Sequence, residues 1–282
     1  MSAGSTRPID PRTALEAVGQ LDDDEIDIAE TALQFARIDQ PGPRVEAARA
    51  VLSALAADAA ALGRATPPDD LPARGAALAH LLTAQYGFRG DAEDYDNPAN
   101  ANLIQVLERR RGLPVALGVL WLHAARAAGW PAHGVDFPAH FLIALEGAGG
   151  QLVADVFDGG RVLDAPALRA LIKRVAGPEA ELRPGLLRPA GSRAVLLRLQ
   201  NNLRTRRLGA GDVPGALAAT LDMLRIAPDQ ASLWREAGAM HQRLDQIAAA
   251  LRCFERFLAL APDGDAATRL RREMTSLRAR LN

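Results

Sequence analysis

His140 and Asp155 are the two side chains of this sequence best placed for chemistry. His140 begins a short apolar run, and Asp155 lies inside a second apolar run, Val153–Phe157, 15 residues further on. A carboxylate inside an apolar strand is costly to bury unless it has a partner. The glycine-rich segment Gly147–Gly150 between the runs predicts an antiparallel hairpin that brings the two side chains together. The sequence therefore predicts a His–Asp pair in which the carboxylate orients the imidazole, with a purely structural His140 as the alternative.

The nucleophile that such a pair would serve is absent. No Ser, Thr or Cys occurs between Ala84 and Gly191. Covalent acyl transfer needs an activated thiol or hydroxyl within hydrogen-bond reach of the base. The only cysteine, Cys253, lies in a distant helical region beside Phe254 and is interpreted as a small buried hydrophobic residue. Thiol-dependent transferase or protease activity is therefore not expected.

Three uses of the pair remain open without a thiol. A metal ion could be held by His133, Asp136 and His140, joined by Asp155, although residues three apart in a strand point to opposite faces. The His140–Asp155 pair could instead activate water for hydrolysis. A former substrate cleft could also hold a peptide or a partner loop, and this is the favoured interpretation. No metal and no cofactor is expected.

The spacing of apolar residues and the positions of proline and glycine predict the helices and strands that must position this pair. Residues 1–20 are polar and are expected to form a mobile N-terminus, and three amphipathic helices are expected between Asp22 and Tyr86. Pro114 in the first turn and Gly129 at the end delimit a long apolar helix. Strands are expected at 133–137, 140–146 and 152–157, a further helix at 166–175, and a proline-rich linker at 177–193.

From Ala194 onward the pattern is helical and it repeats. Pro228 and Pro262 lie 34 residues apart, and so do Ala216 and Ala250. Tetratricopeptide spacing is met in the second unit by Trp234, Gly238, Ala250, Phe254 and Pro262. Small residues there let paired helices cross closely, and the aromatic residues fill the space between them. Such a module suits a protein or peptide partner, and the candidate binding residues are Arg204, Arg206, Arg207 and, in the preceding domain, Trp130. A solvated face is the simpler interpretation of the three arginines.

Composition narrows the class of partner. The 282 residues carry a formal net charge of −1, so no basic field indicates nucleic acid, and the run Arg109–Arg111 is explained by its place at a helix end. The chain's start has no basic region followed by an apolar one, so no secretory signal is predicted. The longest apolar run, Leu113–Ala125, is too short to span a bilayer. A cytoplasmic protein that binds neither nucleic acid nor membrane is expected, and its oligomeric state stays open.

The motifs around these residues resemble a transglutaminase-like core of the papain-like cysteine hydrolase group. In that group Gly-x-Cys begins the central helix, and here Gly112-Leu113-Pro114 stands at that place. The end of the helix is matched by Arg126 and Gly129-Trp130-Pro131, and the remaining triad members by His140 and Asp155. The resemblance covers about Tyr95 to Leu163.

Nearly the whole chain is also similar to a bacterial family in which a helical segment and a transglutaminase-like domain precede tetratricopeptide repeats. That family is often labelled as regulators of the sirC locus. The similarity rests on the stretches Asp24–Asp27, Val106–Pro114, Asp136–Phe141 and Asp158–Gly160.

These observations predict an α+β fold: a helical N-terminal layer on a small transglutaminase-like core with an antiparallel sheet, followed by an all-α tetratricopeptide-repeat module. The expected parts are a mobile N-terminus at 1–20, the helical layer and core domain at 21–176 (core about 95–163), a linker at 177–193 and the repeats at 194–282. The expected function is protein–protein interaction or regulation without covalent catalysis, because Pro114 occupies the place of the nucleophile. The alternative is a hydrolase or amidase that uses water activated by His140 and Asp155.

Overall fold

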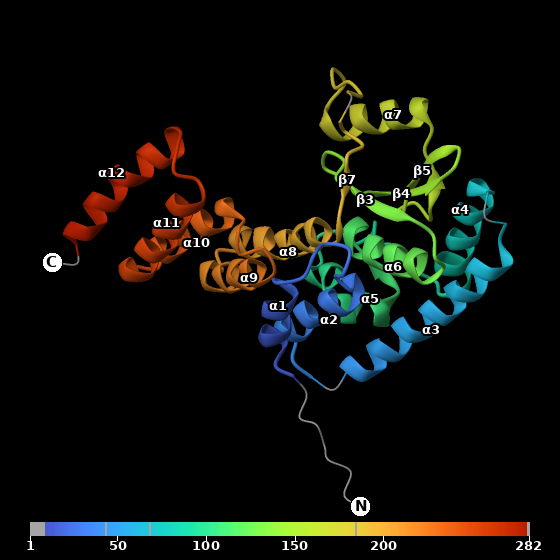
Figure 1. The fold of residues 1–282 in the computed structure, drawn as a ribbon, viewed down its shortest axis with the longest axis horizontal. Helices are drawn as coiled ribbons and strands as arrows, with labels where there is room; N and C mark the ends of the chain where they lie inside the picture. The colour runs from blue at the N-terminus through green and yellow to red at the C-terminus, as the bar shows by residue number, and fades with distance from the viewer. Residues whose placement is uncertain (1–8, 43, 68, 184, 281–282) are drawn as a thin grey trace, which may run out of the picture. The chain divides into compact units, whose positions relative to one another are not determined.

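The computed structural model describes residues 9–42, 44–67, 69–183 and 185–280 (Figure 1). The chain divides into two compact units. One runs from Asp22 to Leu199, and we call it the core unit. The other combines the N-terminal segment up to Leu21 with the chain from Gln200 onward, and we call it the repeat unit.

Helices make up most of the core unit. In chain order they are α2 (Ile28–Asp39), α3 (Val45–Ala65), α4 (Leu71–Ala79), the π-helix η1 (His80–Gln85), the 3-10 helix η2 (Pro98–Ala101), α5 (Leu103–Arg109), α6 (Pro114–Ala127), α7 (Ala165–Ala176) and the first part of α8 (Ser192–Gly209). Aspartates begin three of them: Asp27, Asp70 and Asp164 accept hydrogen bonds from the first backbone N–H groups of α2, α4 and α7. Such caps satisfy donors that have no partner inside the helix.

A five-stranded antiparallel sheet carries the predicted hairpin. Its order is β6–β5–β4–β3–β7, and the strands are β3 (Ala132–Val135), β4 (Leu142–Gly147), β5 (Gly150–Asp155), β6 (Arg161–Val162) and β7 (Pro189–Ala190). Ile143 pairs with Ala154 across the hairpin, so the start of β4 lies beside the end of β5. A separate parallel pair joins β1 (Arg89–Gly90) to β2 (Arg111–Gly112). The α+β fold class is confirmed.

Two helices provide the main packing for this sheet. Helix α6 is buried along almost its whole length, and its Gly118 leaves room for the Phe141 ring, which a Cβ atom would meet at 2.2 Å. Helix α7 packs Leu168, Leu171 and Ile172 against a cluster that includes Leu142 of the sheet. The strand positions are thereby fixed by apolar packing on α6 and α7 rather than by loop geometry.

The segment expected to be a linker belongs to this packing. Residues 189–190 form β7 and pair with β3, and Leu182, Leu186 and Leu187 lie against the α7 cluster. These leucines bury apolar surface against the cluster, and the prolines of the segment do not prevent this packing. The segment predicted as a linker, 177–193, therefore contributes a strand and apolar side chains to the core unit.

The repeat unit is entirely helical in its described residues. Its helices are α1 (Pro11–Val18), the end of α8, α9 (Val213–Ile226), α10 (Ala231–Arg243), α11 (Ile247–Leu260) and α12 (Asp265–Ala279). Gly238 lies against the Phe254 ring, which a Cβ atom would meet at 2.3 Å, and the Trp234 indole donates to the Pro228 carbonyl oxygen at 2.7 Å. The expected roles of these repeat positions are confirmed.

The N-terminal segment contains an element that the sequence did not predict. Residues 11–18 form α1, and Arg12 pairs with Asp222 of α9 at 2.9 Å. Glu16 of α1 also pairs with Arg225. The expected mobile terminus is thus wrong for these residues, because both charged side chains find partners about 210 positions along the chain. Residues 1–8 of that prediction lie outside the described residues. In the part of the chain that the structure describes, no helix is long and apolar enough to cross a membrane.

Candidate functional site: a His–Asp pair without a thiol

His140 and Asp155 form the pair that the sequence predicted. The His140 Nε2 atom lies 2.9 Å from the Asp155 Oδ1 atom. Asp155 is the last residue of β5 and is 2 % exposed, whereas His140 precedes β4 in a turn. Ala139 in that turn has a left-handed φ of 50°, a conformation that a residue with a Cβ atom adopts at a cost and that often occurs at functional sites.

Hydrogen bonds keep Asp155 ionised. Burial raises the pKa of this carboxyl, but the hydrogen bond and charge of His140 lower it, as do the backbone N–H groups of Phe157 and Asp158. The net effect is a pKa below the ordinary value of 3.8. Since a carboxylate only accepts hydrogen bonds, the Nε2 atom of His140 must carry the proton that it shares. The Nδ1 atom of His140 has no hydrogen-bond partner within the described residues, and in the neutral ring it can accept a proton.

Arg198 holds the turn that presents His140. Its Nη2 atom donates to the His140 carbonyl oxygen at 2.6 Å and to the Phe137 carbonyl oxygen at 3.3 Å. Its guanidinium also pairs with Asp136. Arg198 lies on α8, 58 residues beyond His140, and no local pattern in the sequence links the two.

Aromatic rings lie beside the pair. The Phe157 ring meets the His140 ring edge to face at a centroid distance of 6.4 Å, and the Tyr95 ring meets Phe157 in the same way at 5.8 Å. The Tyr95 side chain is among the few large hydrophobic ones left exposed. The loop that carries Tyr95 therefore forms one side of the surroundings of His140.

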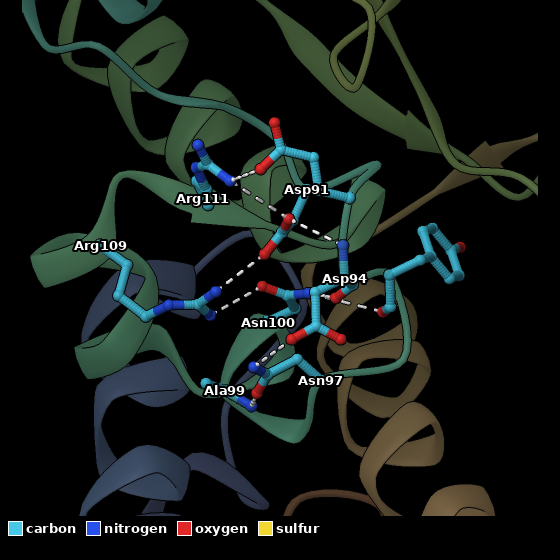
Figure 2. A network of polar contacts seen from close by, with 9 residues as sticks. Asp91, Asp94, Asn97, Ala99, Asn100, Arg109 and Arg111 are labelled. Atoms are coloured by element: carbon cyan, nitrogen blue, oxygen red, sulfur yellow. Dashed lines mark hydrogen bonds and ion pairs between the residues drawn. The ribbon is translucent and has the colours of Figure 1, made fainter.

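A buried polar network fixes that loop (Figure 2). The Arg109 guanidinium donates to Asp91 Oδ2 at 2.8 Å and to Asn100 Oδ1 at 2.9 Å. Asn100 in turn donates to the Asp94 carbonyl oxygen at 2.7 Å, and the Asp94 N–H donates to Asp91. Burial raises the pKa of Asp91, but these donors outweigh it and the pKa lies below the ordinary 3.8. The network ties both ends of the loop 91–102 to α5.

The same loop meets the start of α6, the place at which the sequence resemblance led us to expect a nucleophile. The Leu113 N–H donates to the Asn100 carbonyl oxygen at 3.0 Å, and Pro114 is the first residue of the helix, buried and without a side-chain donor. Cys253 belongs to the other unit, is buried, and burial raises the pKa of its thiol. The pair can therefore orient a proton acceptor or bind a polar group, but it has no covalent nucleophile beside it in the sequence segment 84–191.

Comparison with known families decides the identity of this scaffold. Residues 46–201 match the transglutaminase-like superfamily, and residues 203–275 match the tetratricopeptide repeat. The chain belongs to the transglutaminase-like superfamily. The family that the sequence motifs suggested is thus confirmed at this level.

Bacterial proteins are similar to this chain over most of its length and of theirs. The UPF0162 protein of Xylella fastidiosa strain Temecula1 is 35 % identical over 194 residues, which cover 68 % of this chain and 69 % of the relative. The UPF0162 protein of Vibrio cholerae is 29 % identical over 256 residues, 91 % of this chain and 94 % of the relative. Human F-box only protein 21 is 32 % identical over 168 residues, 56 % of this chain but 26 % of that protein.

The predicted binding arginines are engaged inside the repeat unit. Arg204 pairs with Glu236 of α10, Arg206 donates to the Asn202 carbonyl oxygen, and Arg207 donates to the Gly215 carbonyl oxygen. Trp130 belongs to the core unit, where it lines a cavity. Within the repeat unit, each of the three arginines thus has a polar partner of its own.

The residues considered for a metal site also have other partners. His133 pairs through Nδ1 with Glu146 at 2.8 Å, and Asp136 pairs with Arg198. Within the described ranges, no group of three or more His, Cys, Asp or Glu side chains is arranged to hold a metal ion. His133, Asp136 and His140 are thus engaged separately.

Acid should destabilise the core unit through Asp155 and Asp91. Both carboxyls have a folded pKa below the unfolded value, so their contribution to stability is complete above about pH 5 and is lost as the pH falls through the unfolded value toward the lowered folded values. We expect the urea midpoint to fall between about pH 5 and about pH 3. Asp155→Asn should be less stable at neutral pH but show a shallower fall, and an unchanged pH slope in this variant would contradict the assignment.

Proposed function

We propose that this protein binds segments of other proteins through its repeats, and that its core unit serves recognition rather than covalent acyl transfer. The observation that carries the proposal is the combination of a retained His140–Asp155 pair with Pro114 at the start of α6. Tetratricopeptide repeats in general mediate protein interactions, which supports the first half of the proposal. The missing thiol supports the second half.

A groove of the repeat unit offers a place for a peptide. It has a volume of about 350 Å³ and is lined by α10, α11 and α12. Phe254, Leu270 and Ala239 supply apolar surface, and Arg235 and Arg269 supply positive charge. Two carboxylates also line the groove: Glu236, which pairs with Arg204, and Glu273. Neither guanidinium has a carboxylate within 4 Å among the described residues, in contrast to Arg204. Acidic side chains or a terminal carboxylate with neighbouring apolar residues fit this lining.

Arg235→Ala combined with Arg269→Ala should weaken peptide binding at least about tenfold, because two charge-assisted hydrogen bonds are removed. The measurement is fluorescence anisotropy of the full chain with a panel of labelled ten-residue peptides that have acidic residues and a free or amidated C-terminus. Arg272→Ala is the matched control, since Arg272 lies exposed on α12 outside the groove lining. If no peptide of the panel binds, or the double variant binds as well as the wild type, the groove is not the binding surface.

A second function is favoured by the geometry of the His140 ring. With Nε2 held by Asp155, Nδ1 can accept a proton from water, which is the requirement for a hydrolase that uses an activated water molecule. Ester and amide panels distinguish the two functions. Turnover that His140→Ala abolishes and Asp155→Asn reduces would establish the hydrolase and overturn the recognition role of the core unit.

A further inference from the structure

The core unit contains a cavity of about 560 Å³ that is separate from His140. Four segments of the chain line it: the loop before α2, the end of α6, the connection from Gly129 to His133, and the junction of β7 with α8. Its volume lies within the range usual for small-molecule sites. Leu122 and Trp130 supply apolar surface, and Asp23, Asp24, Arg126, His133 and Ser192 supply polar groups. The Nε2 atom of His133 is buried and has no hydrogen-bond partner among the described residues.

One of the two carboxylates is already committed to the fold. Asp23 accepts hydrogen bonds from the Ser192 and Arg193 N–H groups, both at 2.8 Å, and so caps the first turn of α8. A helix N-terminus offsets negative charge. A Cβ atom at Gly191 would lie 1.9 Å from Asp23 Oδ2, so a larger residue there would displace this carboxylate from its position. Asp23 is therefore a structural group of the cavity wall.

Arg126 and Asp24 are the charges that remain. Arg126 donates through Nη1 to the Ile26 carbonyl oxygen at 2.6 Å and through Nη2 to the Ser192 hydroxyl at 3.4 Å. A guanidinium has five N–H donors, so donors are left for a ligand. Within the described residues neither Arg126 nor Asp24 has an ion-pair partner, although both line the same cavity. The wall thus presents one cation and one anion that do not neutralise each other by contact.

We propose that this cavity binds a small zwitterion, an α-amino acid or a dipeptide. The ligand carboxylate lies on Arg126 and the Ser192 hydroxyl, its ammonium group lies on Asp24, and its side chain packs on Leu122 and Trp130. A simple anion would face the carboxylate of Asp24, and a simple cation would face Arg126, so a ligand with both charges matches this wall better than either. The site goes beyond the proposed function, because it uses neither the His140–Asp155 pair nor the repeat groove.

Isothermal titration calorimetry of the full chain with the twenty free amino acids and a set of leucine-containing dipeptides tests this proposal. We expect saturable binding of zwitterions, at least about tenfold weaker binding of the N-acetylated and the amidated forms of the best ligand, and a similar loss in Asp24→Asn. Asp22→Asn is the matched control, since Asp22 is outside the cavity lining. These ligand controls need no mutation, so the test does not depend on a variant of Arg126, whose side chain also supports Ile26.

Three results would overturn the assignment. The first is the absence of heat with every amino acid and dipeptide. The second is equal affinity for the free and the N-acetylated ligand, which would make the cavity an anion site. The third is equal loss in Asp24→Asn and Asp22→Asn. Peptide binding at the repeat groove is measured on different residues, so it can fail or succeed independently.

Discussion

Arg109→Met is expected to lower the free energy of unfolding by about 3 kcal/mol. The substitution leaves Asp91 buried, at 2 % exposure, without its closest cation, and it leaves the Asn100 side-chain oxygen without its donor. A buried charge that loses its partner is costly because water cannot replace the lost interaction. The loop 91–102 should loosen as a result, and urea unfolding of the full chain at neutral pH measures the effect.

Arg111→Met is the matched control for this prediction. Arg111 lies 3.7 Å from Asp91 and makes its closer contact with Glu93, which is largely exposed. An exposed ion pair contributes about 0–1 kcal/mol, so we expect a small effect. Asp91→Asn combined with Arg109→Met should recover part of the loss, since the double variant buries no unpaired charge. Equal destabilisation by Arg109→Met and Arg111→Met would show that the network of Figure 2 does not hold the loop.

Gly63→Ala is expected to destabilise the core unit by about 2–3 kcal/mol. Gly63 lies in α3, and a Cβ atom there would be 2.2 Å from the Ala128 carbonyl oxygen at the end of α6. The obstacle is backbone, so α3 and α6 must move apart to admit a methyl group. In a helix interior, alanine would otherwise stabilise by about 1 kcal/mol relative to glycine. A loss of stability in this variant therefore indicates the close contact between α3 and α6, whereas a gain would indicate that the contact is absent.

Gly209→Ala provides the comparison. Gly209 ends α8, and a Cβ atom there meets nothing within 4 Å. We expect this change to be neutral or slightly stabilising. The thermal midpoints of the two variants and the wild type, measured side by side, give the answer. A Gly63→Ala protein as stable as the wild type would mean that α3 and α6 do not approach as closely as described.

Local sequence signals predicted the elements that depend on local physics. Pro114 begins α6 as expected, because a helix tolerates proline in its first turn. The hairpin that joins His140 to Asp155 followed from two apolar runs with a glycine-rich segment between them. The positions of Gly238 and Phe254 followed from the spacing of the repeat. In each case the pattern and its structural consequence lie within about 35 residues.

Contacts between distant segments were not predictable in this way. Nothing near Arg198 in the sequence indicates that its guanidinium binds the carbonyl oxygen of His140. Arg204 is a plausible binding residue in the sequence, but in the structure it pairs with Glu236. The cavity beside Trp130 is assembled from four separate segments, so its polar groups are visible together only in three dimensions. The local sequence around a charged residue does not indicate which distant residue will be its partner in the folded protein.

The discontinuous repeat unit sets an order on folding during synthesis. Helix α1 is synthesised before α9. Arg12 and Glu16 therefore have no ion-pair partners until Asp222 and Arg225, about 210 residues later, have been added to the chain. The entire core unit, Asp22–Leu199, is translated in between. The core unit can therefore fold on the ribosome while α1 still lacks its partners, and the contact of α1 with α9 can form only after α9 has been synthesised. A nascent chain stalled before α9 would contain a complete core unit and an unpaired first helix.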